Sequence, residues 1–291
     1  MTETARQLVI RTMSREDLNL AIDWAAQEGW NPGRHDAAPF WAADPEGYLI
    51  GELDEQAVAV ISAVRYGRHF GFIGFYMVKP AYRGQGHGWT IWQAAMQHLQ
   101  GRTVGLDGVV AQQDNYQRSG FALAHRNIRY AGVAASGAST QPQGSGRPGL
   151  VRLKTIPIAA LLDYDRGFFP EPRESFLRAW IAQPGTLALG VIKANRLQGY
   201  GVIRPCRTGF KIGPLFADAP EIAEAIFLGL QQHLPAGEPF YLDVMASAPD
   251  ALDLVARHGM QMVFETARMY LGPAPDLSPA RTYGITSFEL G

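Results

Sequence analysis

Residues 75–88, FYMVKPAYRGQGHG, join an apolar β-rich run to a helical one through three glycines at alternate positions. Gly84, Gly86 and Gly88 lack Cβ atoms, so the backbone there can approach a ligand closely and can adopt positive φ. The first N–H groups of the following helix have no helical partner and carry the positive end of the helix dipole. These groups predict a cradle for an anion such as a pyrophosphate, with Arg83 as an adjacent positive charge.

Two common phosphate-binding motifs do not describe this stretch. GxGxxG fails because, counting from Gly84, Trp89 stands where the third glycine should be, and GxxxxGK[ST] fails because no Gly-Lys pair follows. A flexible glycine-rich turn without a ligand is the alternative interpretation. The preceding strand, Arg83 and the long apolar helix that follows favour the anion site.

Composition narrows the class of protein. A length of 291 residues favours two globular domains. The formal net charge of −1 argues against a nucleic-acid binder that depends on broad phosphate neutralisation. Cys206 is the only cysteine, which excludes an intramolecular disulfide and a multi-cysteine zinc site and fits a reducing compartment. The seven histidines form no HxxxH or HExxH pattern, so we predict no metal.

The N-terminal stretch and the hydropathy pattern bear on location. The first residues, MTETARQLVIRTMSREDLN, are polar and charged, unlike a secretion signal. No window approaches the roughly 18 uncharged apolar residues of a membrane span. The sequence therefore predicts a cytoplasmic protein with no membrane or nucleic-acid partner, and it leaves the oligomeric state open.

One segment differs from the rest of the chain. Residues 131–149, AGVAASGASTQPQGSGRPG, contain no aromatic residue, Leu or Ile. Such a segment buries too little apolar area to offset its ordering entropy, so it predicts a Gly/Ser-rich linker. It divides the chain into an N-terminal domain, 1–130, and a C-terminal domain, 150–291.

Both parts alternate predicted strands and helices, which indicates a mixed α/β fold. In the first part, Ser14 followed by Asp17 predicts a helix start. Strands are predicted at 8–11, 47–51, 57–64, 72–78 and 103–106, with a helix at 89–99. In the second part, strands are predicted at 187–192, 199–203 and 240–244, and helices at 222–234 and 251–258.

A faint internal repeat relates the two parts. Leu106-Asp107 and Leu242-Asp243 each end a predicted strand ahead of a helix and a glycine turn. Arg129-Tyr130 and Met269-Tyr270 follow at nearly matching distances.

The segment Arg83-x-x-Gly86-x-Gly88, after a strand ending in Val78-Lys79-Pro80, resembles the acetyl-CoA-binding motif (Q/R)-x-x-G-x-(G/A) of the GNAT superfamily of N-acyltransferases. Tyr116-Gln117-Arg118-Ser119-Gly120-Phe121 resembles the family's Y-E-K-x-G-F segment. The resemblance covers roughly residues 6–130. One position departs from the family, because Val109 stands where an Asn is common.

The resemblance implies a mixed α/β sheet, two tandem GNAT folds and acetyl-CoA as cosubstrate. Its pyrophosphate would lie on the loop amides, and its pantetheine arm would pair with the preceding strand. The implied cofactor-binding residues are Met77, Val78, Arg83, Gly84, Gln85, Gly86, His87 and Gly88.

Residues 28–33, EGWNPG, further resemble a bacterial subgroup whose second GNAT-like half is degenerate. The equivalent strand and loop in the second half, residues 210–218, are followed by no arginine and no alternating glycines. Glu221 and Glu224 would also bring negative charge near a phosphate. The second half is therefore expected not to bind coenzyme A, but to close the acceptor cleft or continue the sheet, with residues 282–290 adding a strand.

The implied activity is direct transfer of an acetyl group to the primary amine of a small molecule. A primary ammonium with a pKa near ~10 is mostly protonated at pH 7, so a base assists the reaction. Tyr116 matches the family's general acid, which would protonate the leaving thiolate. The base stays open: Asp36 and Asp107 rank ahead of Glu28 and Tyr76.

Trp24, Trp30, Phe40 and Trp41 concentrate aromatic side chains ahead of the sheet. They predict either core packing or an aromatic wall of the acceptor pocket, with Trp30 favoured for the wall because Asn-Pro-Gly follows it. The predicted acceptor-site residues are Glu28, Trp30, Asn31, Asp36 and Tyr76.

Two other functions fit the same motifs. One is a tandem transferase that joins an acyl or aminoacyl group to a larger acceptor. The other is a non-catalytic coenzyme A sensor, in which Tyr116 would have no chemical task.

Overall fold

The computed structural model describes residues 7–134 and 149–291. The elements of the first half are β1 (Val9–Thr12), α1 (Arg15–Gln27), α2 (Ala37–Ala43), β2 (Tyr48–Leu53), β3 (Gln56–Tyr66), β4 (Phe70–Val78), η1 (Pro80–Tyr82), α3 (His87–His98), β5 (Thr103–Val109), η2 (Val110–Gln112), α4 (Gln113–Arg118) and β6 (Ala122–Val133). Those of the second half are β7 (Leu150–Arg152), η3 (Leu153–Thr155), α5 (Ile158–Asp165), α6 (Glu174–Ile181), β8 (Leu187–Lys193), β9 (Arg196–Pro205), β10 (Phe210–Ala217), α7 (Pro220–Gln231), β11 (Pro239–Met245), α8 (Pro249–Arg257), β12 (Gln261–Leu271), η4 (Pro279–Arg281) and β13 (Thr282–Gly284).

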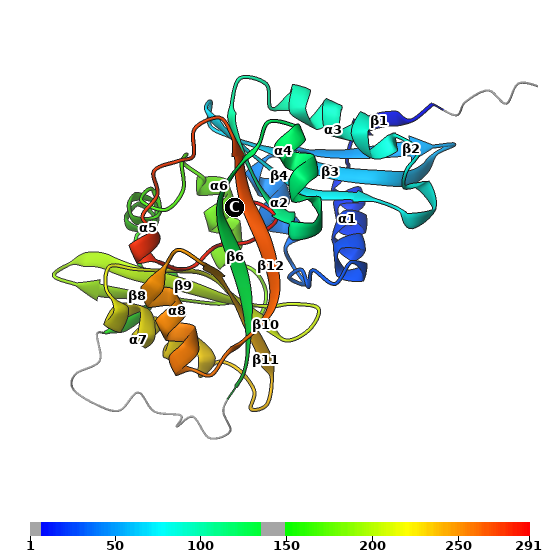
Figure 1. The fold of residues 1–291 in the computed structure, drawn as a ribbon. Helices are drawn as coiled ribbons and strands as arrows, with labels where there is room; N and C mark the ends of the chain where they lie inside the picture. The colour runs from blue at the N-terminus through cyan, green and yellow to red at the C-terminus, as the bar shows by residue number, and fades with distance from the viewer. Residues whose placement is uncertain (1–6, 135–148) are drawn as a thin grey trace, which may run out of the picture.

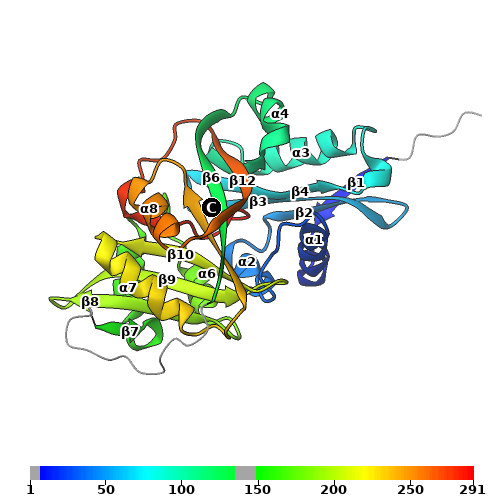
Figure 2. The same cartoon turned by 60° about the horizontal axis from the view of Figure 1, so that its bottom comes forward.

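Local sequence signals in the first half agree with these elements. Ser14 caps α1 in a full capping box with Asp17. Asp54 and Glu55 both adopt positive φ in the tight turn between β2 and β3. Figure 2 shows α3 and α4 on one face of these strands and α1 and α2 on the other, so apolar residues of both faces are covered.

The two halves share one continuous sheet because each half lends a strand to the other. The strand order is β1-β2-β3-β4-β5-β12-β6-β11-β10-β9-β8-β7, with β13 on β10. β12 of the second half therefore lies beside β5, and β6 of the first half lies beside β11. Figure 1 shows these two exchanged strands crossing the centre of the molecule side by side.

The exchange is nearly symmetric. Asn127 on β6 and Thr266 on β12 lie directly opposite each other, and both are buried. The registers also place Asp107 opposite Arg268 and Asp243 opposite Arg129. A pseudo-twofold axis therefore passes between the exchanged strands.

This symmetry corrects the alignment of the sequence repeat by one residue. Arg129 corresponds to Arg268, not to Met269. A shift by one residue matters in a strand because it moves every side chain to the other face.

The predicted linker begins at residue 131, but β6 continues through Val133 and pairs with β11 there. Residues 135–148 of that prediction lie outside the described part of the chain. The backbone of Ala134 extends the contact, since its N–H donates to the carbonyl of Glu238.

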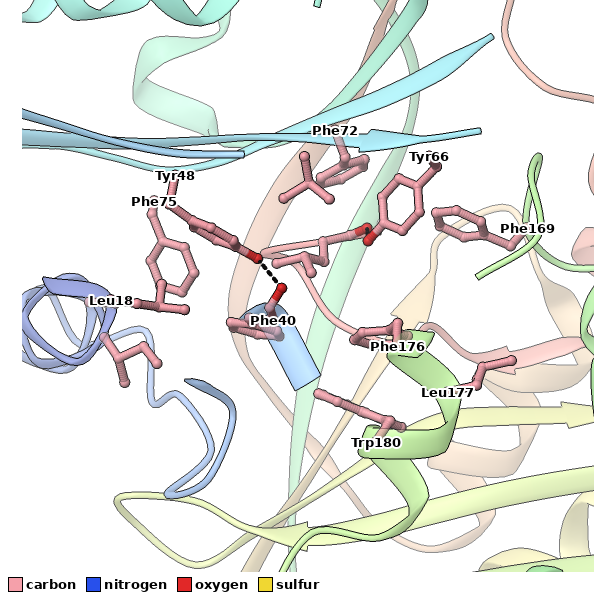
Figure 3. Packing of buried hydrophobic residues seen from close by; sticks show 14 of the residues in the cluster. Leu18, Phe40, Tyr48, Tyr66, Phe72, Phe75, Phe169, Phe176, Leu177 and Trp180 are labelled. Atoms are coloured by element: carbon pink, nitrogen blue, oxygen red, sulfur yellow. Dashed lines mark hydrogen bonds between the residues drawn. The ribbon is translucent and has the colours of Figure 1, made fainter. Parts of the chain in front are cut away.

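An aromatic core spans both halves beneath the sheet (Figure 3). Phe40 of α2 stacks on Trp180 of α6 with ring centroids 6.1 Å apart, and its carbonyl accepts a 2.7 Å hydrogen bond from the Tyr48 hydroxyl. Phe40 therefore belongs to the core. The sequence left open whether the aromatic residues between Trp24 and Trp41 pack in the core or line the acceptor pocket, and Phe40 packs in the core.

A β-bulge bends β4 away from β5. Ser62 pairs with Gly74 and Val60 with Met77, so Phe75 and Tyr76 together oppose one residue of β3. Phe75 has a φ of 46°, a conformation that non-glycine residues rarely adopt. The parallel pairing of β4 with β5 ends at Ile73 and Leu106, and beyond it the two strands splay apart.

In the second half the corresponding gap is filled. β10 pairs with β11 only from Phe210 to Ile212. Beyond that point β13 pairs with β10, at Leu215 and Phe216. The expected strand within residues 282–290 is thus present, and it covers the backbone edge that a ligand would need.

Candidate functional site

A cavity of about 530 Å³ opens where β4 and β5 splay. Its lining residues come from both halves of the chain: Glu28, Trp30, Ile73, Gly74, Phe75, Tyr76, Met77, Val78, Tyr82, Arg83, Gly84, Gly86, Gly88, Trp89, Leu106, Asp107, Gly108, Val109, Gln112, Tyr116, Phe264, Thr266, Phe288 and Glu289. The cavity runs along β4 from Val78, next to the glycine loop, past the bulge to Gly74.

The glycine loop forms one end of the cavity. Gly86 caps α3 with a φ of 87° and Gly84 has a φ of 75°, and open space surrounds the position of a Cβ at either residue. Both backbone conformations favour glycine, and the space they leave exposes the first N–H groups of α3 to the cavity mouth. The loop is therefore shaped to accept an anion.

Arg83 stands beside this loop. Its Nε donates a 2.8 Å hydrogen bond to the carbonyl of Val78, and its Nη2 lies 2.5 Å from Oε1 of Glu28. Both side chains are substantially exposed, so a competing anion can replace the carboxylate at modest cost. Gln85 and His87, predicted with this group, do not line the cavity.

Tyr116 reaches the middle of the cavity from α4. A Cβ on Gly108 would lie 2.3 Å from its Cε2, so only glycine at that position of β5 leaves room for this ring. Burial, with a smaller contribution from Tyr76, raises the pKa of Tyr116 well above its ordinary value. The phenol stays protonated at neutral pH and keeps a proton to donate.

Tyr76 also lines the cavity and packs against α3, with its ring centroid 5.3 Å from that of Trp92. A Cβ on Gly88 would lie 2.9 Å from its hydroxyl oxygen, so the third loop glycine makes room for this side chain. Burial raises the pKa of Tyr76 above its ordinary value, which disfavours the phenolate that a base would require.

Asp107 lines the cavity but is fully engaged. Arg268 contacts both of its oxygens, Nε to Oδ1 at 2.9 Å and Nη2 to Oδ2 at 2.5 Å. Asn127 Nδ2 donates a further 2.7 Å hydrogen bond to Oδ1. All of these contacts hold the carboxylate in place, and the ion pair with Arg268 joins β5 to the exchanged strand β12.

The far end of the cavity is aromatic. Arg129 reaches it from β6, with its guanidinium 4.6 Å from the Phe288 ring centroid and 5.8 Å from that of Phe264. The same guanidinium donates a 2.8 Å hydrogen bond to the carbonyl of Trp30. Trp30, predicted as the acceptor-site aromatic, thus lines the cavity together with two second-half aromatics that the sequence did not indicate.

Two predicted site residues lie elsewhere. Asp36 is completely buried in an ion pair with Arg204 and accepts a 2.7 Å hydrogen bond from the N–H of Gly33. Asn31 exchanges hydrogen bonds with the backbone of Thr208 at the junction of the halves. Neither lines the cavity, so the geometry argues against Asp36 as base and Asn31 as an acceptor contact.

Sequence reasoning missed every cavity residue of the second half: Phe264, Thr266, Phe288 and Glu289. They come from β12 and the segment after β13, more than a hundred residues from the glycine loop. The repeat that relates Asp107 to Asp243 was the one sequence signal for these residues. It indicates that the two halves have equivalent strands, and equivalent strands can exchange places between the halves.

Family comparisons agree with this geometry. A model of the acetyltransferase (GNAT) family matches residues 15–122, and a model described as an acetyltransferase (GNAT) domain matches residues 161–284. The chain is a tandem GNAT acyltransferase. The two matched segments contain the glycine loop and the plugged β10–β11 gap respectively, so one GNAT domain is open and the other is filled by its own strand.

The similarity to known proteins extends over nearly the whole chain. The chain is 27% identical over 278 residues to holothin acyltransferase of Pseudoalteromonas sp. (strain SANK 73390), covering 96% of this chain and 92% of that protein. A solved Pyrococcus horikoshii protein, assigned as an acetyltransferase, aligns with a TM-score of 0.81 at 23% identity over 100% of this chain and 99% of that one. A tandem GNAT protein from the clavulanic acid biosynthesis pathway aligns with a TM-score of 0.63 at 13% identity, covering 92% of this chain and 100% of that one.

The described residues contain neither a metal-binding cluster nor a membrane-spanning helix. Within residues 7–134 and 149–291, no group of three or more His, Cys, Asp or Glu side chains could hold a metal ion. Over the same ranges, no helix has the length and apolar character needed to cross a membrane.

Proposed function

We propose that this tandem GNAT chain transfers an acetyl group from acetyl-CoA directly to the primary amine of a small molecule. The observation that carries the proposal is a single cavity that joins the glycine loop, the splayed edge of β4 and Tyr116. In this arrangement the pyrophosphate would accept hydrogen bonds from the N–H groups around Gly84 and Gly86. It would also replace Glu28 as the ion-pair partner of Arg83. The pantetheine arm would pair with Met77 and Val78, where β4 has left β5.

Tyr116 would act as general acid. Its raised pKa keeps the phenol neutral, so it can donate a hydrogen bond to sulfur as the C–S bond breaks. The proton that Tyr116 gives to sulfur is replaced by one that the attacking nitrogen loses, so no free phenolate accumulates.

The test measures thiol release from acetyl-CoA with a panel of primary amines, together with calorimetry of coenzyme A binding. We expect Tyr116→Phe to lower turnover by about 100-fold or more, while the Kd for coenzyme A changes less than about threefold. Binding without thiol release for every amine would favour a coenzyme A sensor. Absence of binding would refute the whole proposal.

A second candidate is transfer of a longer acyl group or transfer to a larger acceptor. It is favoured by the relationship over nearly the full chain to a protein named holothin acyltransferase. Competition between acetyl-CoA and longer acyl-CoA donors, measured as kcat/KM for each, separates the two candidates.

A further inference from the structure

The carboxylates of the cavity differ in what they contact. Within the described residues three of them line it: Glu28, Asp107 and Glu289. Glu28 is paired with Arg83, and Asp107 is held by Arg268. Glu289 forms no ion pair within those residues, and its Oε2 is buried without a hydrogen-bond partner although the side chain is only 4% exposed.

A buried carboxylate oxygen without a partner is costly, typically by about 1–3 kcal/mol or more for a charged group. The cost is offset here by cations on neighbouring strands, since Arg129 on β6, Arg204 on β9 and Lys211 on β10 all attract Glu289. Burial and the nearby Arg129 also lower the pKa of Lys211. Glu289 therefore lines the cavity and carries a buried carboxylate oxygen that has no hydrogen-bond partner, while three cations on neighbouring strands offset its charge.

The backbone fixes this position at the acceptor end. The carbonyl oxygen of Glu289 would lie 2.2 Å from a Cβ on Gly74, so the segment after β13 packs directly on the bulge of β4. The hydroxyl of Tyr66 donates a 3.2 Å hydrogen bond to the carbonyl of Leu290, the next residue. Phe288 and Phe264 supply an aromatic wall beside it.

We infer that Glu289 is the catalytic carboxylate that binds the ammonium group of the acceptor and takes its proton, for an acceptor whose amine is carried on an alkyl chain attached to an aromatic ring. The inference rests on the proposed function. It gives the second half a chemical role, because the residue comes from the segment that follows the strand plugging the second GNAT domain.

The step balances as follows. One proton passes from the ammonium nitrogen to Glu289 and then to solvent, which leaves a neutral amine. The nitrogen lone pair forms the N–C bond at the acyl carbon, and the C–S bond breaks with its electron pair going to sulfur. Sulfur takes the proton of Tyr116, and the second nitrogen proton returns to Tyr116.

The test compares amines with alcohols of the same shape. Phenethylamine and tryptamine are titrated against phenethyl alcohol and tryptophol, in the presence of coenzyme A. We expect the wild type to bind at least one amine about tenfold more tightly than its alcohol, and Glu289→Gln to lose this preference. Glu289→Gln should also lower turnover about 100-fold at pH 7 and recover as the pH rises toward ~10, where the amine loses its proton unaided.

Glu265→Gln is the matched control. Glu265 lies between the lining residues Phe264 and Thr266, points to the other face of β12 and is paired with Arg126. This variant should keep both preference and turnover. If Glu289→Gln loses coenzyme A binding through misfolding, Glu289→Asp replaces it and should keep the preference for amines while turnover falls.

Two results would overturn the inference: equal affinity of the wild type for every amine and its alcohol, or a preference that survives in Glu289→Gln. Coenzyme A binding in the same titrations reports separately on the proposed function. A chain that binds coenzyme A but shows no preference for amines refutes the role of Glu289 alone.

Discussion

Arg129 of β6 and Asp243 of β11 form a buried bidentate ion pair, with Nε to Oδ1 at 2.7 Å and Nη2 to Oδ2 at 2.8 Å. The two residues belong to different halves, and their pair mirrors that of Arg268 with Asp107. Arg129 also donates a hydrogen bond to the carbonyl of Trp30 and packs on Phe288. The ion pair that joins the two halves therefore also positions the aromatic residues at the acceptor end of the cavity.

Replacing Arg129 with Met is expected to cost about 3–5 kcal/mol of unfolding free energy, because Asp243 is left buried without a counter-ion. The double variant Arg129→Met/Asp243→Leu should recover most of that loss, since the desolvated charges are then gone. Urea unfolding of the wild type, the two single variants and the double variant measures the coupling. Single variants as stable as the wild type would show that the pair does not hold the junction.

Replacing Gly86 with Glu should abolish coenzyme A binding in calorimetry. The new side chain would bring bulk and negative charge into the open space beside the first N–H groups of α3, and its backbone would be strained at a φ of 87°. Gly101→Glu is the control, because Gly101 has a similar φ of 81° with equally open surroundings just beyond the other end of α3. Loss of binding in both variants would point to strain alone.

Replacing Gly74 with Ala should displace the segment that carries Glu289. The new Cβ would meet the Glu289 carbonyl oxygen at 2.2 Å, a contact that requires backbone movement. We expect a loss of about 1–3 kcal/mol of stability together with reduced turnover. Gly149→Ala, where nothing lies within 4 Å, should change neither quantity. A Gly74→Ala variant with unchanged turnover would place the Glu289 segment outside the reaction.

The buried side chain of His125 should make the folded protein less stable in mild acid. Burial, with a smaller contribution from Arg268, lowers the pKa of His125 to about 4. Between pH 6.5 and 4 the unfolded chain binds a proton that the folded chain does not, so stability present above pH 6.5 is lost as the pH falls. The loss should reach about 3 kcal/mol. The unfolding free energies of the wild type and of His125→Gln are measured between pH 4 and 7. The variant should lack this loss of stability, and the same pH dependence in both proteins would contradict the prediction.

The sequence predicted what local chemistry determines. The capping box at Ser14 and the glycines at 84–88 each act through neighbouring residues, so their patterns suffice. Tyr116, which lines the cavity, was predicted in the same way, because its segment has a recognisable pattern.

Long-range relationships were beyond the sequence. Either β6 or β12 could pair with β5, since both are strands of similar pattern that follow equivalent glycine turns. Periodicity does not distinguish a strand that pairs within its own half from one that is exchanged. Asp36 resembled a base in the sequence because its partner, Arg204, lies in the other half. Glu289 carried no local signal at all.

Because of the strand exchange, each half of the chain lacks strand partners that only the other half supplies. A fragment of residues 1–140 would carry β6 without β11 and β5 without β12, and a fragment of residues 141–291 would lack the reciprocal partners. Neither piece should fold or turn over substrate alone, whereas coexpression should reassemble the full sheet. Because the cavity also takes residues from both halves, separation of the exchanged strands should remove the site and the sheet together, so that activity reports on the folding of the whole chain.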